Sequence, residues 1–365
     1  MFLLLLLVLG RVTGARLARR DIKLEVINSE QNKLQFHLSS TNIDKVSYAK
    51  ARHAIKLAGV FLENVFDFKN QITFLIRLMA PCKENKQCPL GLGATGRNFF
   101  NVDTKDNITI MYPQALIKQI PELFVLLNKK DMYMFDIEID FNWDYDHYFP
   151  IDYPTPALAS QYDFLHMLLH EINHGMGMTS TFLGFSRVYP KDFQEGSEEP
   201  TFNFYHTVFD QYIYDAVTHQ PIAATLKSIE PLSTPNRHSR FENITAPFKT
   251  KGRIIFLSIL GNNITLDSGE TVYLSGHPSH LSSDYFRIQD DMMLAQCTGG
   301  AGIQDFLFNY PNWHFSPYGP AILDIHATLG YTLKVPDPNR SLQYYYWFKR
   351  QSKHEEPFNF TMETY

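Results

Sequence analysis

Cysteine is scarce in this chain, and basic clusters, internal repeats and long apolar runs are scarce or absent. Only three cysteines occur among 365 residues, so disulfides do not hold the fold together. The net charge is -5 and no cluster of Lys and Arg stands out, which gives no reason to expect nucleic acid as a partner. Beyond the N-terminal segment, no stretch is long and apolar enough for a transmembrane helix. These absences exclude disulfide scaffolds, nucleic-acid binders and membrane-spanning proteins.

The composition is that of a packed globular protein. Hydrophobic residues make up 44% of the chain, which includes 29 Phe and 20 Tyr. The length exceeds what one hydrophobic core usually supports, so we expect two lobes. An N-terminal lobe is predicted at 21–177 and a C-terminal lobe at 178–334, followed by a tail at 335–365.

The N-terminal residues 1–15 have the pattern of a secretory signal peptide. Their apolar run is too short to span a bilayer, and Gly14 and Ala15 supply small residues for cleavage. Residues 16–20 are either a dibasic processing site or a solvated charged linker. Five N-glycosylation sequons agree with export, and they begin at Asn107, Asn243, Asn263, Asn339 and Asn359. We therefore expect a secreted, extracellular glycoprotein.

The spacing of apolar residues predicts an α+β protein. Helical spacing extends from Val46 to Val65, and the apolar alternation at 134–141 indicates a strand with Phe135, Ile137, Ile139 and Phe141 facing inward. Further strands are expected at 71–79, at 108–111 and within 254–273, further helices at 115–127 (with Pro121 starting a second segment), 157–175, 204–216 and around 321–325, and a loop at 81–96. This order places the helix at 157–175 under a sheet.

The segment from His170 to His174 has the spacing of a zinc-peptidase helix. Residues four apart lie on one helix face, so His170 and His174 can direct imidazole nitrogens at one metal ion. Glu171 projects beside them, where its carboxylate can accept a proton from a metal-bound water. His166 lies one turn earlier, but a single metal ion cannot meet histidines about 12 Å apart. We therefore expect His166 to be a core or supporting residue.

A catalytic zinc ion needs a third protein ligand and an open position. In the compact metzincin pattern, His-Glu-x-x-His-x-x-Gly-x-x-His, the glycine permits a sharp turn that returns the chain to the metal. Gly177 occupies that glycine position, but the last position is Ser180, which is not a credible zinc ligand. The turn is predicted, and the third ligand must come from elsewhere.

The segment 162–178 resembles secreted metzincin-like peptidases with a His-Glu-x-x-His-Gly-x-Gly core. It is most similar to those, including leishmanolysin-type enzymes, in which a long insertion precedes the third histidine. The resemblance covers roughly residues 70–332, with weaker matching pieces at 136–142, 209–215 and 319–325. It implies two lobes: an N-terminal mixed sheet with the active-site helix, and an irregular C-terminal lobe with a Met-turn. Asn173 departs from the pattern, where a small or apolar residue is usual.

In that family a Ser-His segment supplies the third ligand, and an acidic residue with a Met-turn follows. The matching residues here are 279–280 and 290–293. The resemblance therefore implies His280 as the third zinc ligand and Met293 as the methionine under the metal, although the Met-Met pair at 292–293 is uncommon. His277 is the main alternative, and Glu195, Glu198 or Asp210 would serve in a carboxylate-completed site.

The three cysteines leave one without a partner. Cys82 and Cys88 are close enough in sequence to bridge a short loop, which secretion would permit. Cys297, near the predicted Met-turn, is either a small buried side chain or a thiolate that holds the zinc enzyme latent.

Together these features predict a secreted endopeptidase with one catalytic Zn²⁺ that hydrolyses peptide bonds through a metal-bound water. The resemblance implies a protein or peptide substrate added as a strand at the edge of the N-terminal sheet. One alternative is a non-catalytic secreted protein that binds zinc, although a structural site has no use for Glu171. Another is a zinc hydrolase acting on a non-peptide bond, for which we find no recognition motif.

Overall fold

The computed structural model describes residues 24–40, 43–79, 93–103, 109–127, 132–152, 155–181, 206–222, 246–269, 278–285, 291–294, 299–300, 303 and 317–334. Within these ranges the protein is a mixed α+β structure, as predicted. Several predictions concern other residues and lie outside the described ranges: the segments 1–15, 16–20 and 335–365, the sequons at Asn107, Asn243, Asn339 and Asn359, the cysteines Cys82, Cys88 and Cys297, and the alternative ligands His277, Glu195 and Glu198.

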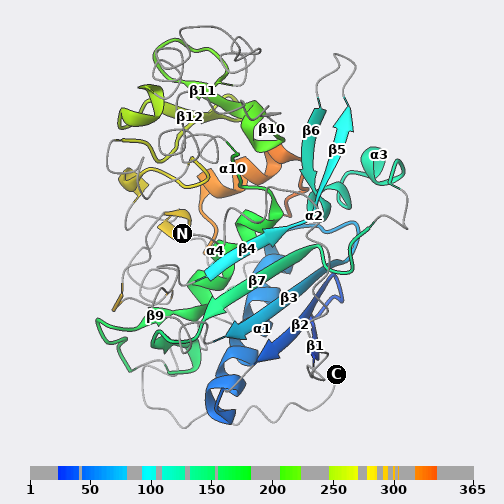
Figure 1. Cartoon of the computed structure of the whole chain (residues 1–365), viewed down its shortest axis with the longest axis vertical. Coiled ribbons are helices and arrows are strands. Elements are labelled where there is room, and N and C mark those ends of the chain that lie inside the picture. Colours follow the sequence, from blue (N-terminus) through cyan, green and yellow to red (C-terminus); the bar gives the residue numbers. More distant parts are fainter. Residues whose placement is uncertain are drawn as a thin grey trace, which may run out of the picture.

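The largest sheet has five strands in the order β1-β2-β3-β7-β4 (Figure 1). Their bounds are Glu25–Asn28 (β1), Leu34–Ser40 (β2), Ile72–Met79 (β3), Ile137–Asn142 (β7) and Gly93–Arg97 (β4). The three central strands are parallel, and the edge strands β1 and β4 are antiparallel to their neighbours. The sheet is therefore mixed, and β4 forms one of its edges.

One face of this sheet is apolar because apolar residues alternate with polar ones along the strands, and the pairing register aligns the apolar residues of neighbouring strands on the same face. Phe36, Phe74 and Ile137 lie side by side on neighbouring strands, and all three are fully buried. Residues of the opposite face are partly exposed, and there Arg77 forms ion pairs with Glu138 and Asp140. The period-two pattern thus decides which face receives the helices.

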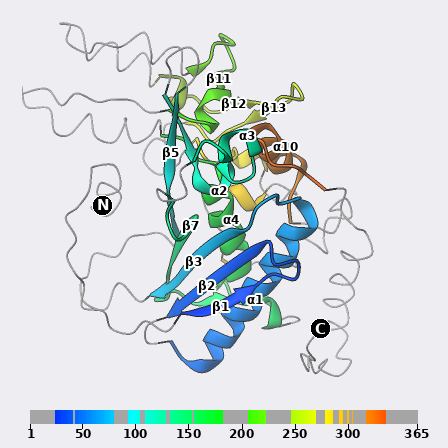
Figure 2. The ribbon, with the colours of Figure 1, turned by 90° about the vertical axis from the view of Figure 1, so that its right-hand side faces the viewer.

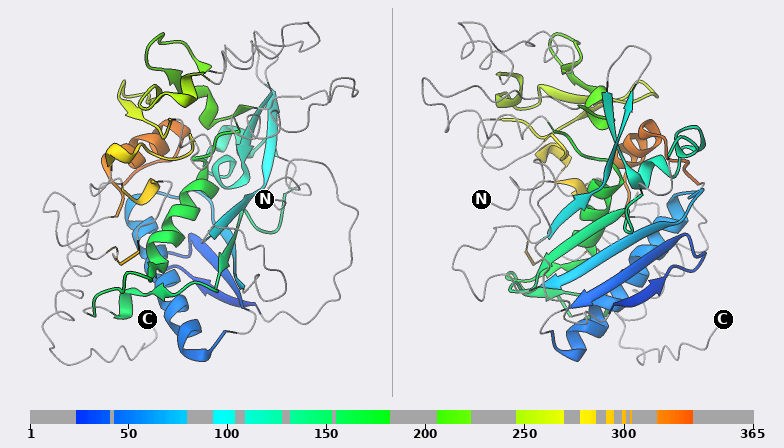
Figure 3. Two further views of the ribbon diagram at one scale, coloured as in Figure 1. Left: turned by 60° about the vertical axis from the view of Figure 1, so that its left-hand side comes forward. Right: turned by 45° about the vertical axis from the view of Figure 1, so that its right-hand side comes forward.

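Helices α1 (Lys45–Val65) and α4 (Phe164–Met176) cover the apolar face of the sheet (Figures 1 and 3). Asp44 caps the N-terminus of α1, and its Oδ1 accepts hydrogen bonds from the amides of Val46 and Ser47, both at 2.9 Å. Helix α4 approaches β7 closely at Gly175, where a Cβ would stand 2.5 Å from Cγ2 of Ile137. This glycine lets the helix lie directly on the sheet.

The remaining elements lie mainly at the other end of the molecule (Figures 1 and 2). Strands β5 (Phe99–Asp103), β6 (Thr109–Pro113) and β10 (His206–Thr207) form one small sheet, β11 (Ile213–Asp215), β12 (Ile254–Leu257) and β13 (Asn263–Thr265) another, and β8 (His147–Tyr148) pairs with β9 (Tyr162–Asp163). Helices α2 (Gln114–Ile117), α3 (Pro121–Phe124) and α10 (Pro320–Leu329) are short, and 3-10 turns occur at η2 (Pro150–Asp152), η3 (Phe209–Tyr212), η4 (Ala246–Lys249), η5 (Ser283–Tyr285) and η6 (Asp291–Met293). None of the described helices is both long enough and apolar enough to span a membrane.

Most predicted elements are confirmed. The helix predicted from Val46 to Val65 is α1, and the strand predicted at 71–79 is β3. The strand at 108–111 corresponds to β6, and the helical stretch at 115–127 divides into α2 and α3 with Pro121 starting the second. The short strands within 254–273 and the helix around 321–325 are also present.

Four predictions about local structure are wrong. The helix predicted at 204–216 consists of β10, η3 and β11, because its ends pair with β6 and β12 and those ladders override local helical spacing. The helix predicted to start at 157 starts at Phe164, since Asp163 caps it. The predicted loop at 81–96 ends in β4, whose ladder to β7 needs only backbone groups. Phe135 precedes β7 and is only partly buried.

Candidate metal centre

Helix α4 has a clear signal at each end. The Asp163 carboxylate accepts a hydrogen bond from the His166 amide at 2.8 Å, which satisfies one of the unpaired amides of the first turn. At the other end, Gly177 has a φ of 125°, and the Met178 amide donates to the Asn173 carbonyl at 3.1 Å. The predicted sharp turn at Gly177 is therefore confirmed, and it directs the chain back past the end of the helix.

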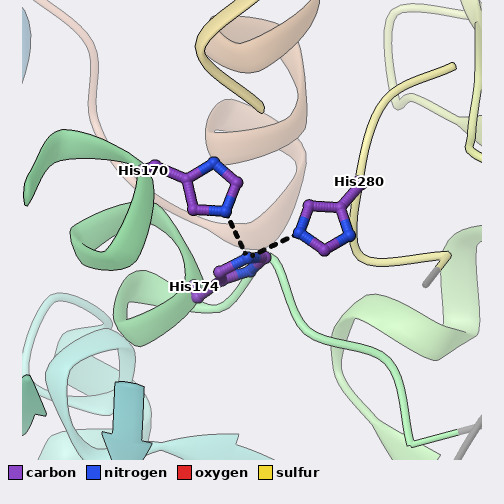
Figure 4. Close-up of side chains that lie close together, drawn as sticks. All are labelled: His170, His174 and His280. Carbon is purple, nitrogen blue, oxygen red and sulfur yellow. Dashed lines mark hydrogen bonds between the residues drawn. The ribbon is translucent and has the colours of Figure 1, made fainter. Parts of the chain in front are cut away.

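Three histidines converge beside this turn (Figure 4). His170 and His174 come from the last two turns of α4 and are each 8% exposed, whereas His280 comes from the segment 278–282 and is half-buried. The Nε2 atom of His174 lies 3.1 Å from Nε2 of His170 and 3.1 Å from Nε2 of His280. The structure thus brings His280 to the helical pair across 106 positions of sequence.

Hydrogen bonds fix the tautomers of the two helical histidines. The Nδ1 atom of His170 lies 2.7 Å from the Met292 carbonyl, and Nδ1 of His174 lies 2.7 Å from the Met178 carbonyl. Because a carbonyl oxygen only accepts, each Nδ1 carries the proton, and in the neutral ring Nε2 then presents a lone pair. Two such lone pairs at 3.1 Å repel each other unless a cation or a proton lies between them.

The spacing of the nitrogens suits a small, strongly binding cation. With zinc–nitrogen bonds of about 2.0–2.1 Å, two ligands of a tetrahedral ion stand about 3.3 Å apart, close to the separation of the Nε2 atoms here. Three neutral imidazoles at this spacing can hold one zinc ion and leave a fourth position open. Backbone carbonyls on Nδ1–H orient the rings, as is usual around zinc-binding histidines.

The predicted Met-turn lies against the site. Helix α4 contacts η6, in which Met293 is fully buried, and the Met293 carbonyl accepts the amide of Leu281 at 2.9 Å. The His280 carbonyl in turn accepts the amide of Asp267 at 2.9 Å, beside β13. The segment that carries His280 is therefore held between β13 and η6. Burial raises the pKa of Asp267 to about 6.

The other predicted residues have clear positions. Glu171 is partly exposed on α4, next to the buried His170. His166 is not part of the three-histidine cluster, and burial lowers its pKa to about 4, which keeps it neutral. Asp210 is fully buried and binds Thr181 and Thr207, so it is not a ligand of this cluster. Asn263 is exposed at the start of β13, where a glycan has room.

Asn173, the departure from the metzincin-like pattern, has a partner on α10. Its Oδ1 lies 2.6 Å from Nε2 of His326, and its Nδ2 donates to the Leu169 carbonyl at 2.7 Å. Asn173 and His326 are both fully buried, and burial lowers the pKa of His326 to about 3. The polar residue is thus satisfied between α4 and α10, with the ring of Phe66 edge-on to His326.

Several contributions to the site have no signal in the sequence. The carbonyls of Met178 and Met292 act through backbone atoms, which every residue possesses. The pairing of Asn173 with His326 joins residues 153 positions apart. Local patterns could identify the helical set His170, Glu171 and His174, the glycine at 177 that follows the helix, and the Ser-His segment at 279–280.

Comparison with known proteins adds a family but no named activity. Residues 16–230 match the family described as SPBPB7E8-like. Neither a curated protein nor a solved structure matches the chain. The matched span includes α4 with His170, Glu171 and His174, and it ends before His280. Because this span is more than half of the chain, the protein belongs to the SPBPB7E8-like family.

Proposed function

We propose that this protein is a zinc-dependent endopeptidase that cleaves peptide bonds in secreted or extracellular proteins. The observation that carries the proposal is the convergence of His170, His174 and His280, with Nε2 separations of 3.1 Å along the cluster. The Nδ1–H groups of His170 and His174 donate to backbone carbonyls, so the Nε2 atoms of these two rings present lone pairs that can bind a metal ion. A partly exposed Glu171 beside buried ligands completes the set that hydrolysis needs.

Each residue has a distinct task in the proposed reaction. Zinc, when bound by three imidazoles, acts as a Lewis acid that polarises a carbonyl and makes water nucleophilic near neutral pH. The Glu171 carboxylate accepts the proton of the attacking water and later delivers it to the nitrogen of the leaving amine. The carbonyls of Met292 and Met178 keep the His170 and His174 rings in the ligating tautomer.

The finer assignment to a metzincin-like, two-lobed fold with a leishmanolysin-like arrangement belongs to this proposal. A mixed sheet carrying α4, a glycine turn at Gly177, a distant third histidine and buried methionines in η6 support it. Strand β4 is an edge of the sheet and α4 packs against it, so a peptide added to that edge would lie beside the site. Secretion through the predicted signal peptide at 1–15 is part of the same proposal.

The test is metal content and proteolysis measured on the same purified protein. We expect one zinc ion per chain by metal analysis, and hydrolysis of casein or a peptide library that a chelator abolishes and added zinc restores. Glu171→Gln should retain zinc and lose hydrolysis, because the ligands remain while the proton acceptor is gone. Zinc binding without any hydrolysis by the wild-type protein would favour the non-catalytic alternative. Full activity of Glu171→Gln would refute the role of Glu171.

A further inference from the structure

Residues 178–181, which we call the connecting segment, contact both His174 on helix α4 and the loop that carries His280. At its start the Met178 carbonyl accepts the Nδ1 proton of His174. Two residues later the Ser180 amide donates to Oγ of Ser279 at 2.8 Å, and Ser279 immediately precedes His280. Ser180 and Ser279 are both buried. The position at which the compact pattern would need a histidine therefore holds the loop that supplies His280.

Asp210 anchors this connecting segment from the side. Its Oδ2 accepts hydrogen bonds from the amide and hydroxyl of Thr181, at 3.2 and 2.8 Å, and from the amide and hydroxyl of Thr207, both at 2.9 Å. The Thr207 hydroxyl lies 2.7 Å from the Thr179 carbonyl as well. One carboxylate thus gathers residues 179–181 and Thr207.

Asp210 and Thr207 are held in place by the pairing of β10 with β6. Thr207 belongs to β10, which pairs with Ile110 and Met111 of β6, and Asp210 follows in η3. Asp210 is fully buried, and burial raises the pKa of its carboxyl. Four donors from Thr181 and Thr207 converge on Oδ2 of this buried side chain, so its position and that of the connecting segment are fixed together.

We infer that Asp210 is a positioning residue of the metal centre. Through Thr181 and Thr207 it holds the connecting segment, which sets the orientation of His174 through the Met178 carbonyl and the place of His280 through Ser279. This inference rests on the proposed function, since it assumes that the three histidines bind zinc. Supporting residues of this kind typically change metal affinity 10–100-fold when altered.

The test compares two variants that lose the same kind of hydrogen bond. Thr181→Val combined with Thr207→Val removes hydroxyl donors to Asp210 but leaves both amide donors, so the carboxylate keeps partners. Thr73→Val is the matched control, because the Thr73 hydroxyl also donates to a buried carboxylate, that of Asp136 just before β7, at 3.0 Å. Zinc Kd is measured by competition with a chelator, and the visible spectrum of the Co²⁺-substituted protein reports ligand geometry.

We expect the double variant to bind zinc at least 10-fold more weakly and to show an altered Co²⁺ spectrum. Thr73→Val should keep both the wild-type Kd and the wild-type spectrum, even where its Tm falls. Asp210→Asn retains an oxygen acceptor and should bind zinc more tightly than Asp210→Ala. A double variant with wild-type Kd and spectrum but a lowered Tm would overturn the inference. A wild-type protein that binds neither metal would refute the proposed function itself.

Discussion

The buried His326 makes the stability of this protein depend on pH in a calculable way. Its pKa is lowered to about 3 by burial, against about 6.5 for an exposed histidine in the unfolded chain. The unfolded state therefore binds the proton more readily, and acid favours unfolding. The contribution of neutral His326 is complete above about pH 6.5 and is lost progressively as the pH falls from there toward 3.

The size of the effect follows from the two pKa values. Each pKa unit corresponds to about 1.4 kcal/mol, so lowering the pH from 8 to 4.5 should remove about 3 kcal/mol of unfolding free energy through this residue. His326→Gln keeps a side-chain N–H that can donate to Oδ1 of Asn173 but does not titrate. The variant should therefore lack this part of the acid destabilisation.

Urea unfolding of the metal-free protein at pH 8, 6 and 4.5, with chelator present, measures the effect. Other buried histidines, such as His147 with a pKa lowered to about 4, contribute equally to both proteins and cancel in the difference. The free energy of wild type minus that of His326→Gln should fall by about 3 kcal/mol between pH 8 and pH 4.5. A difference that stays constant across this range would show that His326 is not buried in its neutral form.

Three further predictions concern single side chains. His280→Ala should lose bound zinc in metal analysis, whereas His277→Ala should retain it; the reverse result would move the third ligand to His277. Gly175→Ala should lower the free energy of unfolding by about 1–3 kcal/mol, because the new Cβ would stand 2.5 Å from Ile137. Adding Ile137→Ala should reduce the loss caused by Gly175→Ala, and a double-mutant cycle in urea would measure this coupling. Asn263→Gln should remove one glycan from the protein secreted by eukaryotic cells, seen as a smaller mass shift on enzymatic deglycosylation; an unchanged shift would mean that this exposed sequon is not used.

Local regularity explains why some of the site could be predicted. His170 and His174 share a face because an α-helix repeats every 3.6 residues, and the apolar residues around them indicate that a helix forms. Gly177 follows at the place where the chain must adopt a positive φ, which glycine accepts without strain. These features depend only on residues a few positions apart, so a local sequence pattern is enough to predict them.

Helix and strand predictions failed where distant partners decide the conformation. The segment 204–216 has helical spacing, yet its ends form ladders with β6 and β12. Strands β1 and β2 lie outside the predicted elements, although the alternation of Leu34, Phe36 and Leu38 is a strand signal. A backbone ladder depends on which segment lies alongside, and local spacing carries no information about that segment.

The sequence by itself determined the zinc-type helix, with His170, Glu171 and His174 in fixed relation to one another, because the regular backbone hydrogen bonding of a helix places residues four apart on one face. The family resemblance implied His280 as the third ligand, but only the tertiary structure brought it to that pair, and only the tertiary structure decided that the carbonyls of Met292 and Met178 orient the two helical rings and that Asn173 faces His326. Those contacts join positions up to 153 residues apart and depend on how α4, α10 and the segments near β13 pack. Every residue has a backbone carbonyl, so residue type cannot predict which carbonyl meets a histidine ring; that depends on how the chain packs.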